Sequence, residues 1–173
     1  MSTAVGGIVF RPEEVSDAVA VGRLLQDAFG GPAEATLVDE LRAADELVLG
    51  LVAVAGPARI VGYLGFPRLT IETAEGLHPA VGLAPLAVAS SHQGRGIGAT
   101  ILRAGLDRLI ARREEIVFVL GDPALYGRFG FSAEDARAFV SPYAGAQFMA
   151  RRLAAGAPRR GRLRYPAAFD VFS

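Results

Sequence analysis

The segment HQGRGIGATILRAGL, His92 to Leu106, says more about the fold than any other part of the chain. It places three glycines, at 94, 96 and 98, immediately before an apolar pattern with the period of a helix. The first N–H groups of a helix have no partner inside it and carry partial positive charge. Glycine lets an anion approach them without a clash against Cβ. The segment therefore predicts an anion-binding turn at the start of a helix.

The surrounding patterns predict a mixed sheet. Residues 80–88, AVGLAPLAV, are expected to form a central strand before the glycine turn, and residues 116–120, IVFVL, a strand after the helix. Two strands joined by a helix are expected to be parallel. Upstream, residues 47–56 and 58–72 alternate as an antiparallel hairpin around Gly56 and Pro57. Pro85 cannot donate a ladder hydrogen bond, so a bulge or loosened pairing is expected beside it.

The remaining segments complete an α+β, or mixed α/β, domain. A strand is expected from Ile8, then a helix capped by Ser16 or Asp17, and a second helix after Pro32. Late strands are expected at FSAE, which starts at Phe131, and at residues 147–153. The tail from residue 154 is expected to be irregular.

Composition excludes several kinds of chemistry. The 173 residues contain no cysteine, so disulfides, thiolate metal sites and cysteine nucleophiles are excluded. All eighteen basic residues are arginine, so a P-loop and Schiff-base chemistry are excluded as well. Residues 1–89 carry eleven acids and five arginines, and residues 90–173 carry seven acids and thirteen arginines. A basic half suits a phosphorylated ligand, and an acidic half suits a cation.

Besides the general anion-binding turn, the three glycines leave two further interpretations open. Gly94, Gly96 and Ala99 fit G-x-G-x-x-A, the fingerprint of dinucleotide-binding domains. That fingerprint normally lies in the first strand–helix–strand unit, whereas here an antiparallel pattern precedes it. Asp122, which would be the ribose-binding acid, lies in a predicted turn. A glycine turn without a ligand is the second interpretation.

The sequence LAVASSHQGRGIGATIL resembles the acyl-CoA loop of the GNAT superfamily of N-acetyltransferases, whose pattern is Q/R-x-x-G-x-G/A. Gln93, Gly96 and Gly98 match it. The resemblance extends to FRPEEVSDAVAVGRLLQDAF and VLGDPALYGRFGF, and LAPLAV with RYPAAF resembles a bacterial subgroup of predicted acetyltransferases. It implies one domain over residues 1–173, with its core at about 8–153 and a C-terminal extension at 154–173. It also implies a mostly antiparallel central sheet with one splayed parallel strand pair and flanking helices.

The resemblance implies the residues that bind acetyl-CoA. Pantetheine would pair with the backbone of the strand segment Leu86, Ala87 and Val88. The diphosphate would lie on the amides of Gln93, Gly94, Arg95, Gly96, Ile97, Gly98 and Ala99. Replacing Gly96 or Gly98 by valine is expected to weaken CoA binding and to leave the fold largely intact.

The resemblance also implies catalytic candidates. Tyr126 matches the position of a frequent tyrosine proton donor for the leaving thiolate. Glu72 is the leading candidate for accepting the proton of the amine, with Glu75 and His78 as alternatives. Three acids of the second helix could attract a cationic acceptor: Glu34, Asp39 and Glu40. The alternative interpretations of these side chains are a core tyrosine and solvated acids.

These observations predict an N-acetyltransferase that transfers acetyl from acetyl-CoA to a primary amine directly, without a metal. The alternatives are a non-catalytic acyl-CoA-binding module and a nicotinamide dinucleotide enzyme. The expected partner is a small-molecule or peptide amine, and the expected state is a cytoplasmic monomer or homodimer that binds no membrane. The arginines at 151, 152, 159, 160, 162 and 164 lack interleaved aromatic residues, so nucleic acid is not expected.

Overall fold

In the computed structural model, which describes residues 2–173, contacts divide the chain into two compact units. The first consists of residues 2–66, 84–107 and 167–173, and the second of residues 67–83 and 108–166. Strand β4 (Arg59–Thr73) and helix α3 (Ile97–Ala111) each contribute residues to both units.

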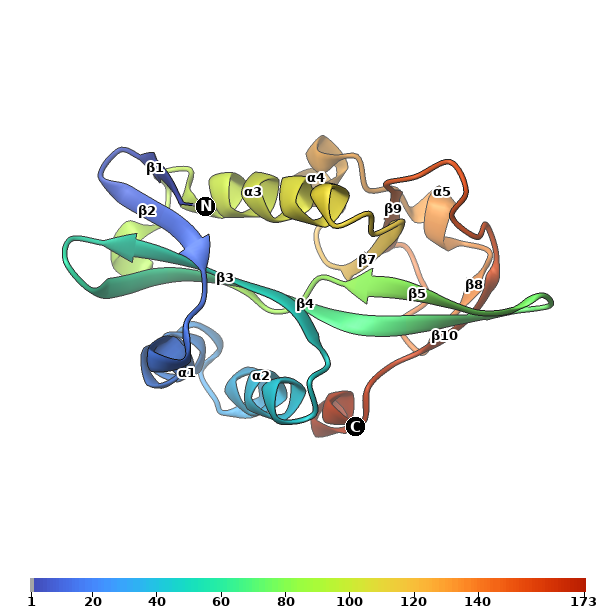
Figure 1. Ribbon diagram of the computed structural model, residues 1–173, viewed down its shortest axis with the longest axis horizontal. Helices are drawn as coiled ribbons and strands as arrows, with labels where there is room; N and C mark the ends of the chain where they lie inside the picture. Colours follow the sequence, from blue (N-terminus) through green and yellow to red (C-terminus); the bar gives the residue numbers. More distant parts are fainter. Residues whose placement is uncertain (1) are drawn as a thin grey trace. The chain divides into compact units, whose positions relative to one another are not determined.

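The first unit contains an antiparallel sheet between helices. Its strands are β1 (Thr3–Val5), β2 (Ile8–Pro12), β3 (Leu47–Ala55), the first part of β4, and β6 (Leu86–Val88). They are ordered β1-β2-β3-β4-β6. Helices α1 (Ala18–Phe29) and α2 (Ala33–Ala43) lie on one side of these strands and α3 on the other (Figure 1).

Apolar helix faces hold these layers together. The core under α1 joins Val21, Leu24 and Leu25 to side chains of β3, β4 and β6. Burying a leucine or valine side chain contributes about 1.5–3 kcal/mol, so these three side chains hold α1 against the sheet. On the other side, Ile101 and Leu102 of α3 are fully covered. The predicted helices and antiparallel hairpin are confirmed.

The second unit is a mixed sheet around a core rich in phenylalanine. Its strands are the end of β4, β5 (Gly76–Gly82), β7 (Ile116–Leu120), β8 (Phe139–Val140), β9 (Phe148–Arg152) and β10 (Gly161–Arg164). Their order is β8-β10-β4-β5-β7-β9, with parallel pairing of β5 with β7 and of β8 with β10. Short helices α4 (Pro123–Tyr126) and α5 (Ala133–Ala136) complete the unit. The Phe118 ring packs edge-on against Phe139 at 4.9 Å and stacks with Phe148 at 5.7 Å between centroids.

Three sequence predictions differ from the structure. Residues 80–88 are not one strand: β5 ends at Gly82 and β6 begins at Leu86, separated by Pro85, whose peptide bond is cis. FSAE does not form a strand, because Ser132 makes a single bridge to Ala150 and its hydroxyl caps α5. The tail is not irregular, since it forms β10 and a 3-10 helix, Ala167–Phe172, whose Ala168 packs on α2.

Candidate functional site

The backbone of the glycine turn explains two of its three glycines. Gly94 has φ of 74° and Gly96 of 78°, a left-handed conformation that L side chains rarely adopt. Gly98 differs, because it lies in the first turn of α3 without a positive φ. A Cβ built on Gly98 would meet only Val88 Cγ2, at 3.7 Å, an ordinary contact. The backbone conformation therefore favours glycine at 94 and 96, whereas at 98 a Cβ would fit against Val88 without strain.

The turn presents its backbone to solvent. Residues 93–96 are exposed, while Ile97 is buried and anchors the start of α3. Thr100 closes the first helical turn, with its N–H and its hydroxyl both donating to Gly96 O at 3.0 and 2.8 Å. The N–H groups that precede Thr100 have no carbonyl within the helix to bond. They form an exposed set of donors at the positive end of the helix dipole.

Strand β6 has a second set of backbone groups that β4 does not use. Ala89 N–H donates to Val61 O at 2.8 Å, and Gly65 N–H donates to Pro85 O at 3.0 Å. Bonded pairs alternate along an antiparallel ladder, so the peptide groups of Leu86 and Val88 point away from β4. The Gln93 side chain reaches one of them, with Nε2 donating to Val88 O at 3.1 Å. Gln93 thereby ties the glycine turn to the strand before it.

Basic side chains surround the turn. Arg59 Nη2 donates to Ser91 Oγ at 3.2 Å, and Ser91 Oγ lies 2.8 Å from His92 Nδ1. Partial desolvation of His92, together with the charges of Arg95 and Arg59, lowers the pKa of its imidazole. Repulsion among neighbouring cations is expected where a surface is arranged to receive an anion.

Tyr126, in the second unit, is nearly buried and has an available hydroxyl. Its ring packs edge-on against Phe131 at 5.9 Å, and Gly121 lets it approach, since a Cβ there would lie 2.5 Å from Tyr126 Cε2. The Tyr126 hydroxyl makes no hydrogen bond within residues 2–173. Every fully buried side-chain N or O atom among these residues has a hydrogen-bond partner, so the unbonded hydroxyl is in contact with solvent. Burial raises the pKa of the phenol, which is therefore protonated at neutral pH and able to donate.

Glu72, also in the second unit, is ion-paired. Arg164 on β10 donates to its carboxylate from Nε, and this hydrogen bond lowers the pKa of Glu72. Of the alternatives, Glu75 lies in the turn before β5 and His78 lies in β5, opposite Ile71. Because of Arg164, Glu72 is a weaker base than an unpaired glutamate.

The three candidate acids of α2 differ in whether they form an ion pair. Asp39 pairs with Arg42 at 2.9 Å, whereas Glu34 and Glu40 have no ion pair among residues 2–173. Sequence reasoning missed a half-buried partner of the same arginine, Glu13. Arg42 Nη2 lies 2.6 Å from Glu13 Oε2, and the hydroxyl of fully buried Tyr63 donates to Glu13 Oε1 at 3.1 Å. Glu13 is 29 positions from Arg42 and 50 positions from Tyr63, so no local sequence pattern predicts these contacts.

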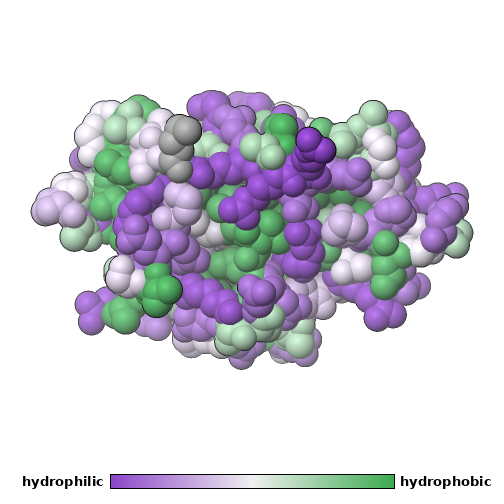
Figure 2. Space-filling model, viewed as in Figure 1, coloured by the Kyte–Doolittle hydropathy of each residue, from purple (hydrophilic) through white to green (hydrophobic). Residues whose placement is uncertain are grey.

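Within residues 2–173, no helix combines the length and the apolar character needed to cross a membrane. On the face drawn in Figure 2, hydrophobic and hydrophilic residues are interspersed.

The chain belongs to the GNAT family of acetyltransferases, since residues 10–133 match the acetyltransferase (GNAT) domain. Among its relatives is YhbS of Escherichia coli K12, an uncharacterized N-acetyltransferase. The two are 40% identical over 124 residues, which are 72% of this chain and 73% of YhbS. YjhQ of the same strain, also an uncharacterized N-acetyltransferase, is 33% identical over 137 residues, or 78% of this chain and 75% of YjhQ.

Solved structures agree with this membership. The crystal structure of E. coli YhbS in complex with CoA superposes with a TM-score of 0.87 at 34% identity, covering 100% of this chain and 97% of that one. A GNAT acetyltransferase from Brucella melitensis in complex with acetyl-CoA gives 0.79 at 30% identity, covering 94% and 98%. The resemblance and the fold class predicted from the sequence are confirmed.

Proposed function

We propose that this chain is an N-acetyltransferase that transfers the acetyl group of acetyl-CoA to a primary amine. The observation that carries the proposal is the glycine turn before α3, with its left-handed glycines and exposed N–H donors. Diphosphate is the group such a turn suits best. Two GNAT relatives at 30% identity or more, described as complexes with CoA and acetyl-CoA, support this choice.

In the proposed complex, the amides of residues 93–99 bind the diphosphate, and the outward-pointing peptide groups of Leu86 and Val88 pair with the pantetheine amides. Strand-like pairing with an unused backbone edge is a general way to hold an extended ligand. Arg59 and Arg95 add positive charge around the diphosphate. The basic excess of residues 90–173 favours the same ligand.

The proposed chemistry is direct transfer. The neutral amine attacks the thioester carbon and forms a tetrahedral intermediate. The intermediate collapses by breaking the C–S bond, which leaves the amide and CoA thiolate. Tyr126 gives its proton to the thiolate sulfur, and Glu72 accepts the proton that the amine nitrogen loses. A covalent cysteine intermediate is excluded because the chain contains no cysteine.

Acceptor recognition is proposed to use Glu34 and Glu40 of α2. Both are acids without an ion pair among residues 2–173, so both can attract a cationic amine at modest cost. Small molecules and peptide amines both fit this chemistry.

Thiol release from acetyl-CoA across a library of amines tests the proposal. The chain contributes no thiol of its own, so the background is low. We expect release only when an amine is present, with the acetylated amine found by mass spectrometry. Tyr126→Phe should lower kcat about 100-fold, the usual contribution of a positioned general acid. Tyr165→Phe is the matched control, because Tyr165 is a half-buried tyrosine whose hydroxyl is already hydrogen-bonded to Ser141.

The outcomes separate the candidate functions. Binding of acetyl-CoA with no release for any amine, and no effect of Tyr126→Phe, would favour the non-catalytic module. Thermal stabilisation by NAD(H) and not by CoA would contradict the proposal at its first step.

A further inference from the structure

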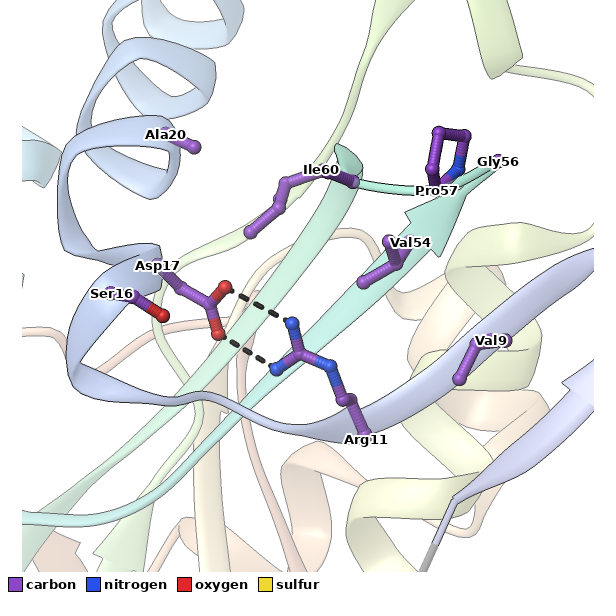
Figure 3. Close-up of a pocket in the computed structure, with 10 residues that line it drawn as sticks. Val9, Arg11, Ser16, Asp17, Ala20, Val54, Gly56, Pro57 and Ile60 are labelled. Atoms are coloured by element: carbon purple, nitrogen blue, oxygen red, sulfur yellow. Dashed lines mark hydrogen bonds and ion pairs between the residues drawn. The ribbon is translucent and has the colours of Figure 1, made fainter.

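A pocket in the first unit lies under the N-terminus of α1, beside the β3–β4 turn. Its volume is about 410 Å³. Apolar side chains form most of its walls, from strands (Val9, Val54 and Ile60), from α1 (Ala20) and from the turn (Pro57). Figure 3 shows these side chains around the guanidinium of Arg11. None of them belongs to the proposed acetyl-CoA site.

Arg11 is held in this pocket by a two-pronged ion pair. Its Nη1 and Nη2 donate to the two carboxylate oxygens of Asp17 at 2.7 and 3.1 Å, and Nη1 also donates to Pro12 O at 3.0 Å. Asp17 Oδ2 accepts a further bond from Glu14 N–H at 2.7 Å. Asp17 is only 8% exposed, so both of its oxygens are occupied and covered. The pair therefore has a fixed orientation.

This arrangement leaves two donors of Arg11 unused. A guanidinium has five N–H groups, and three are engaged. The other two are Nε–H and the second Nη2–H, which make no hydrogen bond within residues 2–173. They lie side by side, on the side of the guanidinium that faces Val54 and Ile60 in Figure 3. Two parallel N–H groups match the two oxygens of a carboxylate.

The composition of the pocket narrows the ligand further. Among the described residues that line the pocket, only Arg11 and Asp17 are charged. Their charges compensate each other, so the pocket suits a monoanion better than a phosphate dianion. Its walls are aliphatic, and they would bury a branched hydrocarbon group. We propose that this pocket binds a small branched aliphatic carboxylate through the unused edge of Arg11, at a site separate from the acetyl-CoA loop.

Titration of the full chain with isovalerate, followed by ¹H–¹⁵N NMR, tests this site. We expect the Arg11 Nε–H resonance and the Gly56 amide to move together, with Kd on the order of 1 mM for a ligand of this size. Isovaleramide, which has the same shape without the charge, should bind at least about tenfold more weakly.

Three variants complete the test. Arg11→Lys keeps the positive charge near Asp17 but lacks the two-pronged edge, and Ala20→Leu fills the pocket from α1. Each should weaken isovalerate binding at least about tenfold, as read at Gly56. Ala28→Leu, on an exposed part of the same helix, should bind as the unchanged chain does. Thermal unfolding of each variant verifies that it folds.

The proposal is overturned if isovalerate moves neither resonance at about ten times the expected Kd. It is also overturned if folded Arg11→Lys or folded Ala20→Leu retains full affinity, or if isovaleramide binds equally well.

Discussion

Gly98→Val separates the ligand-binding role of the glycine turn from its folding role. Gly98 has no positive φ, and its nearest potential contact, Val88 Cγ2, lies 3.7 Å from a built Cβ. Valine is slightly better than glycine inside a helix, by a few tenths of a kcal/mol. The free energy of unfolding should therefore change by less than about 0.5 kcal/mol.

The cost for CoA binding should be large. The valine methyls would occupy the space above the α3 terminus, where the diphosphate is proposed to approach the N–H groups. Each hydrogen bond to a charged group contributes about 1.5–3 kcal/mol, so losing one or two costs roughly 2–4 kcal/mol. Kd for CoA should rise about 30- to 1000-fold.

Isothermal titration with CoA and chemical denaturation measure the two effects on the same protein. Gly96→Val serves as the contrast, because its φ of 78° adds about 1–2 kcal/mol of backbone strain to any loss of binding. The sequence alone predicted that both variants keep the fold, and the structure limits that expectation to Gly98. If Gly98→Val binds CoA with unchanged affinity, the turn is not the diphosphate site.

Three further predictions follow from other contacts. Gly105→Ala should destabilise the chain by about 1 kcal/mol, since its Cβ would lie 2.6 Å from Phe66 Cε2 in a filled core. Gly22→Ala has open space around its Cβ and should stabilise the chain by up to about 1 kcal/mol. Denaturant unfolding measures the free energy of unfolding of both variants. Arg164→Gln should move the acidic limb of the profile of kcat/KM against pH to higher pH. The reason is that Arg164 lowers the pKa of Glu72, so without it Glu72 is protonated at a higher pH. An acidic limb that does not move would remove Glu72 from the mechanism. Gln93→Ala should raise KM for acetyl-CoA about fivefold with kcat nearly unchanged, because it removes the hydrogen bond to Val88 O, which contributes about 1 kcal/mol. An effect on kcat alone would contradict the role of Gln93 in positioning the turn.

Local patterns predicted most of the fold. The helical period of α1 and α3 and the alternation of β3 and β4 are properties of neighbouring residues, which the sequence displays directly. Pro85 also signalled the break between β5 and β6, because its missing N–H acts locally. The boundaries were less accurate, and one predicted strand proved to be two.

Long-range contacts could not be read in the same way. Strand β10 exists because it pairs with β4, and its Arg164 bonds a glutamate 92 residues earlier. The sequence predicted a cap for α1 at Ser16 or Asp17, and Asp17 is the N-cap residue. Its carboxylate, however, bonds Arg11 and Glu14 N–H, not the N–H groups of α1. The Glu13–Arg42–Tyr63 cluster likewise joins distant segments. For the candidate site, the sequence predicted a glycine turn at the start of a helix, while the bond from Gln93 to Val88 O required coordinates.

The central claim is that the turn before α3 binds the diphosphate of acetyl-CoA. A crystal structure of the chain with CoA tests it most directly. We predict diphosphate oxygens within hydrogen-bond distance of backbone N–H groups of residues 93–99, and pantetheine amides paired with Leu86 and Val88. A CoA molecule bound elsewhere, with these N–H groups facing water, would contradict the account.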